Sequence, residues 1–453
     1  MIKRKYAAMI VIAITVLILS ACDTKREEPD LGHVDDDTIV AEYNDDDALV
    51  ADRLVIWWDT GSGVPYKTFA EEALNKRYPK TRFQFTEFTT YMRPSYLDMM
   101  KSKPSPDLIV FDTRFLPLMI ETDYLEPIPD MYGVEMDYDT ITELRASVSD
   151  LSLYVLPFGR IGEGLFYNKK VFDERNIPYP KDGMTWDEVI ELAKVLKSSR
   201  RSPIDVSAYD SMASQLSLRM YDPETGQLDF ESEEWKELTR ILIEINDLDE
   251  YSSEIDGNGG SLSLSFSKGD FAMVVGPLFG HGFLKTGFMD FEGNLTSYEV
   301  DWDMVSFPVF DDEQRLRPAD YLLGIGIPKG SPNKEDALKV LRYLLSREVQ
   351  EENSRKGLIS MRADAGAFAD DFGSFSILAG KSVSSLLSEG PKGERDPVFE
   401  HLDAIGKLLS EMVYLDDSWR DVAVEKAQGR ISEIIPIIMK ERQKYIEEIR
   451  SKF

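Results

Sequence analysis

A stretch of about sixty residues that begins at Leu54 constrains the fold most, because strand and helix patterns alternate along it. Leu54–Trp58 and Leu108–Phe111 are continuous apolar runs with the length of buried strands. Between them, Arg82–Phe88 alternates polar and apolar residues, as a strand does. We expect helices at about 66–78 and 94–101, each followed by proline. The order strand, helix, strand, helix, strand implies a parallel sheet with right-handed crossovers.

A second region with strand and helix patterns follows this sheet. Leu165–Asn168 and Phe271–Val275 have the apolar content of buried strands. Thr185 and Glu188 have the spacing of a capping box that begins a helix. Trp235–Leu248 carries apolar residues at helical spacing. Roughly the last hundred residues are mainly helical in pattern, so the sequence predicts an α/β chain with a largely helical C-terminal part.

The N-terminus has the three parts of a secretory signal. Basic residues at Lys3–Lys5 precede an apolar run, Ala7–Leu19, and small residues follow it. The order Leu19–Cys22 resembles the bacterial lipobox, in which the cysteine is acylated and becomes the new N-terminus. We therefore expect residues 1–21 to be removed and Cys22, the only cysteine, to carry palmitate and related acyl chains. The alternative is a plain secretory signal with an incidental cysteine.

The composition changes after this cysteine. Residues 22–52 contain the triplets Asp35–Asp37 and Asp45–Asp47 and few large apolar residues, which is typical of a disordered acidic tether. Calcium loops use spaced ligands and a required glycine, so these triplets do not indicate a calcium site. The formal net charge is -30, or -33 without the three basic residues of the signal. Such acidity argues against nucleic acid as a partner, because that affinity comes largely from Lys and Arg on phosphates.

Six landmarks of the folded part occur in the order of a known family. They are Leu54–Trp58, Ser105–Phe111, Leu156–Gly159 followed by Leu165–Phe172, Thr185–Glu188, Phe266–Met273 and Gly324–Glu335. Together they resemble the extracellular solute-binding protein family 1, the group typified by maltose- and oligosaccharide-binding receptors. The resemblance runs from about Leu54 to Arg362 and continues more loosely to the end.

The resemblance implies a two-lobed, periplasmic-binding-protein-like (type II) fold, in which hinge crossovers join two α/β lobes around a ligand cleft. The chain is expected to cross near Leu156–Gly159, Val274–Pro277 and Tyr321–Gly326. The predicted lobe boundaries follow from these crossings and assign 53–157 and 275–322 to the N-terminal lobe, and 158–274 and 323–453 to the C-terminal lobe.

Candidate ligand-binding residues lie at the expected strand ends and crossovers, because ligands of open α/β sheets settle at the carboxyl ends of strands. They are Trp58, Asp59, Thr60, Asp112, Thr113, Phe158, Gly159, Gly276, Pro277, Phe279, Tyr321 and Arg362. An indole can stack on the apolar face of a pyranose while Asp and Thr bond its hydroxyls. The alternative interpretation places Trp57 and Trp58 in the core and leaves Asp59 to start a turn.

One candidate marks a departure from the family pattern. Family members often carry a tryptophan directly after the Gly-Pro of the return crossover, whereas here Leu278 and Phe279 follow Gly276 and Pro277. The resemblance therefore offers Phe279 only as a substitute for that stacking ring. Arg362 is a candidate because it lies where family members reach back into the cleft.

Signatures of catalysis are weak in this sequence. The three histidines are widely scattered, so no zinc site is indicated. No Gly-x-Ser-x-Gly motif occurs, so the common hydrolase signature is missing. Paired carboxylates, as in a glycosidase, stay open because 82 acidic residues offer many pairs. We predict a binding protein without enzymatic activity, metal or cofactor.

The resemblance implies a receptor that captures a solute outside the membrane and passes it to the permease subunits of an ABC importer. Carbohydrate is the first expectation, and anchoring through acylated Cys22 places the receptor on the extracytoplasmic face of the cell membrane. Three alternatives stay open: the same fold with another solute such as a polyamine, a secreted lipoprotein glycoside hydrolase, and a sensor accessory that signals to a membrane kinase.

Overall fold

The computed structural model describes the chain in separate segments. They are 48–61, 63–89, 100, 105–129, 134–148, 150–198, 202–206, 208–219, 232–248, 266, 271–278, 288–289, 295–296, 300–311, 316–376, 378–388, 390–396, 437, 440, 443–444 and 446–447. The predicted signal peptide, Cys22 and most of the predicted tether lie outside these residues. So does the predicted helix at 94–101, apart from Met100.

The first sheet has five strands in the order β2-β1-β3-β11-β4. Its strands are β1 (Arg53–Asp59), β2 (Arg82–Phe88), β3 (Leu108–Asp112), β4 (Val155–Ile161) and β11 (Tyr321–Gly326). β1 pairs in parallel with both β2 and β3, which confirms the parallel sheet predicted from the alternating pattern. β11 runs antiparallel between β3 and β4 and so adds a late segment of the chain to an early sheet.

Helices of this sheet follow the apolar pattern of their sequences. The predicted helix after β1 is present as a π-helical turn, Lys67–Glu71, that continues into α2 (Glu72–Arg77). A short 3-10 turn, Thr113–Phe115, leads from β3 into α4 (Leu116–Glu121). α5 (Tyr138–Ala146) begins at Asp137, whose side chain accepts a hydrogen bond from the Thr140 N–H.

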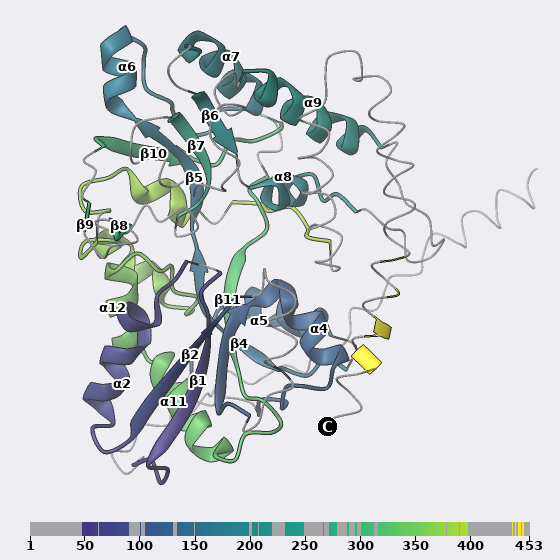
Figure 1. The fold of residues 1–453 in the computed structure, drawn as a ribbon, viewed down its shortest axis with the longest axis vertical. Coiled ribbons are helices and arrows are strands. Elements are labelled where there is room, and N and C mark those ends of the chain that lie inside the picture. Colours follow the sequence, from purple (N-terminus) through teal and green to yellow (C-terminus); the bar gives the residue numbers. More distant parts are fainter. Residues whose placement is uncertain are drawn as a thin grey trace, which may run out of the picture. The chain divides into compact units, whose positions relative to one another are not determined.

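Two further helices follow β11. They are α11 (Lys334–Leu344) and α12 (Arg347–Arg355). The buried apolar residues of α11, including Ala337, Val340 and Leu341, belong to the same hydrophobic cluster as β1 and β3. Figure 1 shows α2 and α11 beside the strands of this sheet.

The second sheet has four strands in the order β10-β5-β7-β6. Its strands are β5 (Glu163–Asn168), β6 (Ser202–Val206), β7 (Phe271–Pro277) and β10 (Trp302–Ser306). β5 pairs antiparallel with both β7 and β10, whereas β6 and β7 are parallel. β8 (Phe288–Met289) and β9 (Leu295–Thr296) form a separate antiparallel pair.

Helices pack a second hydrophobic cluster onto this sheet. They are α6 (Lys169–Arg175), α7 (Trp186–Leu196), α8 (Tyr209–Gln215) and α9 (Glu233–Leu248). The predicted capping box is present: Thr185 Oγ1 accepts from the Glu188 N–H, and the Glu188 side chain accepts from the Thr185 N–H. Trp235 and Ile241 of α9 belong to this cluster together with Trp186 of α7. Figure 1 shows α6, α7 and α9 beside the strands of this sheet.

Strand pairing distributes the chain between the sheets differently from the predicted boundaries. β10, predicted for the N-terminal lobe, pairs with β5 in the second sheet. β11 extends past residue 322 in the first sheet, and α11 packs there too, although 323–453 was predicted for the C-terminal lobe. The physical reason is that β11 supplies the partner for both β3 and β4, which no local pattern reveals.

Crossovers between the sheets occur at two described places. One lies at Gly162, between β4 and β5, and one between β10 and β11. At the third expected crossing β7 remains in the second sheet to its end, and the Leu278 N–H donates to the Gly162 carbonyl.

The described C-terminal part contains two 3-10 helices, η3 (Ala365–Asp371) and η4 (Val383–Leu387). Residues 397–436, where much of the predicted helical part falls, lie outside the described residues. In the part of the chain that the structure describes, no helix is both long and apolar enough to cross a membrane.

Candidate functional site

Trp58 lies in the core rather than at the rim of the first sheet. Its side chain is completely buried, and its Nε1–H donates to the Val64 carbonyl at 2.7 Å. The ring of Phe158 meets it edge-on with centroids 5.4 Å apart, and Phe85 packs edge-on from β2. Trp57 is buried as well, so the structure places both indoles as the alternative interpretation expected.

The two residues that end β1 have different environments. Asp59 is buried, and its carboxylate accepts a hydrogen bond from the Gly61 N–H. Thr60 is exposed, and its hydroxyl donates to the Phe88 carbonyl at the end of β2. Asp59 thus closes the turn after β1, and Thr60 ties that turn to the end of β2.

The end of β3 carries a charged group that faces the second lobe. Asp112 is buried and forms an ion pair with Arg114, and it also accepts from the Arg114 N–H. The guanidinium of Arg114 also pairs with Asp210 at the start of α8. It lies 4.3 Å from the centroid of the Tyr321 ring, within the range of a cation–π contact. Arg114 therefore connects the first sheet to a helix of the second.

Asp210 is the centre of this inter-sheet cluster. It pairs with Arg395 at 2.9 Å as well as with Arg114, and Arg395 also donates to the Ala319 carbonyl. Burial alone would raise the pKa of Asp210, but the positive charges of Arg114 and Arg395 outweigh burial and hold that pKa below its usual value. The carboxyl is therefore ionised at neutral pH.

Glu163 begins β5 directly after the crossover, next to Asp210. Its Oε1 accepts a hydrogen bond of 2.6 Å from the Ser211 hydroxyl. Burial, aided by the negative charge of Asp210, raises the pKa of Glu163 to about 7. Two neighbouring carboxyls thus have pKa values displaced in opposite directions.

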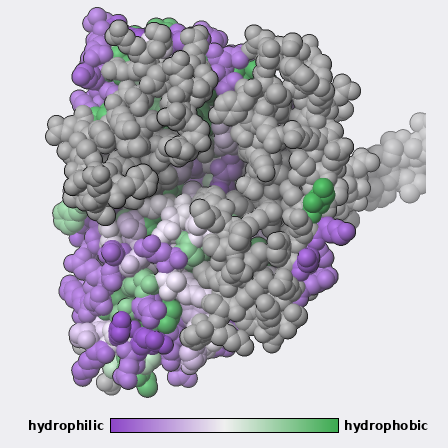
Figure 2. All heavy atoms as spheres, in the orientation of Figure 1, coloured by the Kyte–Doolittle hydropathy of each residue, from purple (hydrophilic) through white to green (hydrophobic). Residues whose placement is uncertain are grey.

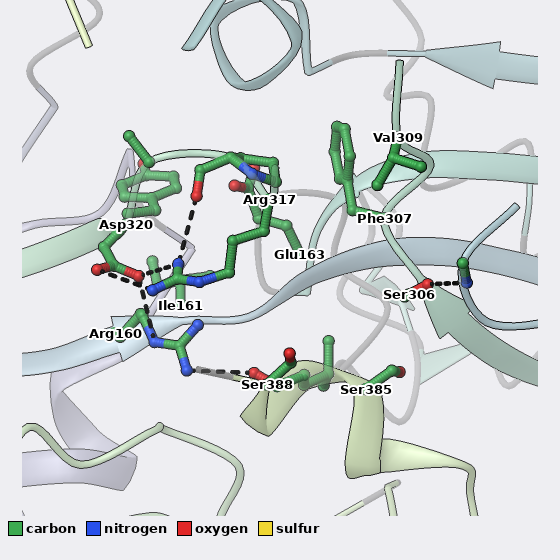
Figure 3. Close-up of a pocket in the computed structure, with 15 residues that line it drawn as sticks. Arg160, Ile161, Glu163, Ser306, Phe307, Val309, Arg317, Asp320, Ser385 and Ser388 are labelled. Atoms are coloured by element: carbon green, nitrogen blue, oxygen red, sulfur yellow. Dashed lines mark hydrogen bonds and ion pairs between the residues drawn. The ribbon is translucent and has the colours of Figure 1, made fainter. Parts of the chain in front are cut away.

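A cavity of about 160 Å³ lies at the crossovers. Its walls come from the β4–β5 crossover, from the segment after β10, from the segment before β11 and from η4. Figure 3 shows Arg160 and Arg317 directed toward Asp320, with Ser385 on η4 and Ser388 directly after it. The hydroxyls of Ser306, Ser385 and Ser388 contribute to the lining, as do the rings of Phe307 and Tyr321.

Asp320 is the carboxylate that the cationic side chains beside this cavity share. It accepts a 2.5 Å hydrogen bond from Arg317, pairs with Lys392 at 2.8 Å and lies 3.6 Å from Nε of Arg160. Burial would raise the pKa of Asp320, but the Arg317 hydrogen bond and the charges of Arg160 and Lys392 hold it well below the usual range. Lys392 also pairs with Glu143, so three cationic side chains share two carboxylates here.

The remaining predicted residues have mainly structural surroundings. Phe158 is completely buried, and a Cβ at Gly159 would come within 2.6 Å of Leu358, so glycine there admits a core side chain. Arg362 is buried and donates to the Leu345 carbonyl, besides pairing with Asp364 and Glu135. Its charge is therefore engaged within the first lobe.

Other predicted residues lie at the crossovers. Gly276 and Pro277 end β7, where they pair with Gly164 and Glu163 of β5. Phe279 lies outside the described residues. Tyr321 lines the cavity and packs against Arg114, and the hydroxyl of Thr113 donates to the Leu322 carbonyl. The structure thus brings Asp112, Thr113 and Tyr321 together and keeps Arg362 apart from them.

Sequence reasoning missed the charged residues that join the two sheets. Arg114 follows the predicted pair Asp112 and Thr113 directly, and Glu163 stands two residues before a predicted strand, so both had a local signal. Asp210 and Arg395 had none, because nothing in their neighbourhood distinguishes them from the other charged residues.

On one face of the molecule the described residues are mainly polar. Figure 2 shows hydrophilic residues over most of the coloured face, and hydrophilic atoms at the bottom of a hollow near its centre. In the described segments, no group of three or more His, Cys, Asp or Glu side chains is arranged to hold a metal ion.

Two α/β sheets, each with its own helices and joined by crossovers beside a polar cavity, define a two-lobed binding protein. A family model described as bacterial extracellular solute-binding protein matches residues 57–351. The chain belongs to this family, which confirms the resemblance found in its motifs. No curated protein sequence matches the chain.

Solved structures support the fold assignment. The ABC substrate-binding protein Lmo0181 from Listeria monocytogenes, in complex with cycloalternan, has a TM-score of 0.63 at 15% identity, covering 85% of this chain and 99% of that one. A solute-binding protein from Agrobacterium vitis S4 with bound D-mannitol has a TM-score of 0.62 at 16% identity, with coverage of 86% and 99%.

A third similar structure is the maltose/maltodextrin-binding domain MalE from Bdellovibrio bacteriovorus bound to maltotriose. Its TM-score is 0.60 at 19% identity, covering 85% of this chain and 100% of that domain. At these identities the likeness concerns the fold. The predicted two-lobed, periplasmic-binding-protein-like α/β fold is confirmed.

Proposed function

We propose that this chain captures a carbohydrate outside the cytoplasmic membrane and delivers it to the permease subunits of an ABC importer. The observation that carries the proposal is the Arg114–Asp210–Arg395 cluster, which joins strand ends of one sheet to a helix of the other. Such a joint lies where a solute would bridge two lobes, and a bridging solute favours closure by its affinity difference between open and closed forms. Family membership and the carbohydrate complexes of the similar structures support the solute class.

Anchoring is the second part of the proposal. The order Leu19–Cys22 supports acylation of Cys22, and acyl chains on that residue would hold the protein on the extracytoplasmic face. The acidic segment after Cys22 would serve as a tether between membrane and receptor. Replacement of Cys22 by alanine is expected to release the protein from the membrane fraction, whereas retention there would contradict the anchor.

The lobes are proposed to be discontinuous. Strand pairing supports a first lobe of residues 53–161 with 321–355, and a second lobe of residues 163–306. Asp59, Thr60, Asp112 and Thr113 remain proposed solute contacts at the strand ends.

The alternative of a glycoside hydrolase has one observation in its favour. Glu163 and Asp210 have pKa values displaced in opposite directions, which is the pattern of an acid paired with an ionised carboxylate. We propose a receptor that leaves its solute unaltered, because the family consists of binding proteins. Overnight incubation with maltotriose and cycloalternan, followed by chromatography of the sugars, is expected to yield no product.

A ligand screen tests the function directly. Ligand binding to the native state stabilises it by RT ln(1 + [L]/Kd) and so raises the melting temperature. We expect at least one sugar or polyol from a panel that includes maltotriose, cycloalternan and D-mannitol to raise it, with calorimetric titration giving the Kd. Spermidine serves as the comparison for a polyamine receptor. A shift with spermidine and none with any carbohydrate would overturn the proposed solute class.

A further inference from the structure

A short segment late in the chain contacts both lobes. We call residues 390–396 the C-terminal strap, and they lie beyond residue 351, where the match to the family model ends. The Arg317 N–H donates to the Pro391 carbonyl at 2.9 Å, and the Gly393 N–H donates to the Arg317 carbonyl at 3.0 Å. The strap therefore pairs with the segment that crosses from β10 to β11.

Lys392 fixes one end of the strap to the first lobe. Its Nζ pairs with Glu143 on α5 at 2.5 Å and with Asp320, before β11, at 2.8 Å. α5 belongs to the first lobe, because its Leu144 is part of the hydrophobic cluster of the first sheet. The side chains of Lys392 and Glu143 are 29% and 53% exposed, so water competes for this ion pair.

The other end of the strap is fixed to α8 in the second lobe. Ala213 of α8 belongs to the hydrophobic cluster of the second sheet. Gly393 packs so closely against this helix that a Cβ there would come within 1.9 Å of the Ser214 carbonyl oxygen. Arg395 pairs with Asp210 at 2.9 Å, and its side chain is 14% exposed. Close backbone packing and a less exposed ion pair hold this end more firmly than the Lys392 end.

The strap is too short to follow a wide separation of the lobes. Lys392 and Arg395 are three residues apart, and an extended backbone of that length spans at most about 10 to 11 Å. Once the segment is extended, any further separation of α5 from α8 requires one end to detach. The Lys392 end detaches first, because its contacts are ion pairs that water can replace.

We propose that residues 390–396 form a releasable strap that restrains separation of the two lobes, with the ion pairs of Lys392 as the end that releases. The strap acts whatever solute the lobes hold, so it goes beyond the proposed function. Without the Lys392 contacts, the lobes sample a wider range of separations, because the more open forms no longer cost the loss of these ion pairs.

Two substitutions and one matched control test the strap. Lys392→Met removes both ion pairs and keeps an aliphatic side chain, and Glu143→Gln removes only the charge on α5. Lys334→Met is the control, because Lys334 forms a partly exposed pair with Glu126 within the first lobe. Circular dichroism and melting temperature establish that each variant is folded.

The distance between spin labels on the two lobes gives the readout. Lys76→Cys on α2 and Val195→Cys on α7 place one label at an exposed position of each lobe, and Cys22→Ser removes the only other cysteine of the complete chain. Pulsed electron–electron double resonance without added solute measures the distribution of distances. We expect its width to about double in Lys392→Met, to increase less in Glu143→Gln and to stay unchanged in Lys334→Met.

Other outcomes would overturn the strap. One is a distribution in Lys392→Met that coincides with that of the labelled protein without this substitution. Another is an equal broadening in Lys334→Met, because the change would then follow from the loss of any partly exposed ion pair. If Lys392→Met failed to fold, Glu143→Gln would decide in the same way. None of these outcomes depends on which solute binds, so the proposed function stands or falls separately.

Discussion

Two clusters of polar residues, one buried around Asp107 and one partly exposed around Asp210, differ in what they connect. Asp107 is 2% exposed and accepts hydrogen bonds from the Val55 N–H, the Ser331 hydroxyl and the Asn333 side-chain amide. All of these groups belong to the first lobe and none of the donors is charged. Asp210 instead accepts from two guanidiniums, one of which comes from the first sheet while Asp210 stands on a helix of the second.

One of these clusters stabilises a single lobe, and the other connects the two lobes. The Asp107 cluster joins segments more than two hundred residues apart within the first lobe, and a buried carboxyl that accepts several hydrogen bonds makes such a junction rigid. The Asp210 cluster joins two lobes, which under the proposed function would separate to admit a solute. Ion pairs suit that task, because each charge regains water when the units part.

Replacement of Asp107 should produce the largest effect. Asp107→Ala leaves three donors without their buried acceptor, so we expect the free energy of unfolding to fall by about 3 kcal/mol. Urea denaturation at pH 7 measures it. Asp107→Asn, which keeps one acceptor oxygen, should lose less than the alanine variant. A loss below about 1 kcal/mol in both variants would show that this cluster does not hold the first lobe together.

Asp210→Asn should have an intermediate effect on stability and a clear effect on the lobes. We expect the free energy of unfolding to fall by about 2 kcal/mol, because Arg114 and Arg395 lose a shared anion that is partly exposed. Small-angle X-ray scattering should show a larger radius of gyration without solute. Unchanged scattering would contradict the role of this cluster as a joint between lobes, and Asp187→Asn, which breaks an exposed pair with Arg240, is the control.

Glu163, which lies next to Asp210, provides a test of pH dependence. Its pKa is raised to about 7 from an ordinary value of 4.5, mainly by burial and then by Asp210. Folding therefore favours the protonated form, and the ionised form is penalised progressively as pH rises from about 4.5 to about 7. The free energy of unfolding should fall over this interval by on the order of 2 kcal/mol more than in Glu163→Gln.

Denaturation curves at pH 5 and pH 7.5 for both proteins measure this difference. Arg114, Arg395, Asp210 and Ser211 surround Glu163 and are retained in the variant, so their own titration cancels in the comparison. If the free energy of unfolding changes with pH in the same way in both proteins, Glu163 does not titrate near neutral pH.

An exposed ion pair should give the smallest effect. Arg219 and Glu394 form a pair at 3.1 Å, with side chains 58% and 73% exposed. We expect Arg219→Ala to change the free energy of unfolding by less than about 0.5 kcal/mol, since water and salt screen such pairs. The same urea titration measures this change. A larger loss would show that the exposure of an ion pair does not by itself predict its contribution to the free energy of unfolding.

Local pattern was sufficient for much of the fold. The apolar runs at Leu54 and Leu108 predicted β1 and β3, and the capping box at Thr185 predicted the start of α7. Both signals are local, because strand length and capping depend on neighbouring residues. The place of β11 between β3 and β4 was beyond such reasoning, because it depends on pairing across two hundred residues.

The candidate site was predictable only in part, for the same reason. Strand ends at Asp112 and Thr113 were identified, since parallel strands present their carboxyl ends together. Trp58 has the residue type of a sugar-stacking ring, but its Nε1–H bond to Val64 and its edge contact with Phe158 belong to the core. The ion pair between Arg114 and Asp210 forms only in the folded protein, where the two sheets meet, so residue spacing in the sequence does not predict it.

The antiparallel position of β11 also has a consequence for biosynthesis. While the ribosome is still making residues before Tyr321, β3 lacks one of its two neighbours and β4 lacks its pairing partner in the first sheet. The early strands therefore have no finished sheet to join until about seven-tenths of the polypeptide has emerged. If the protein is secreted as proposed, this delay would help to keep the nascent chain unfolded while it passes through a translocation pore.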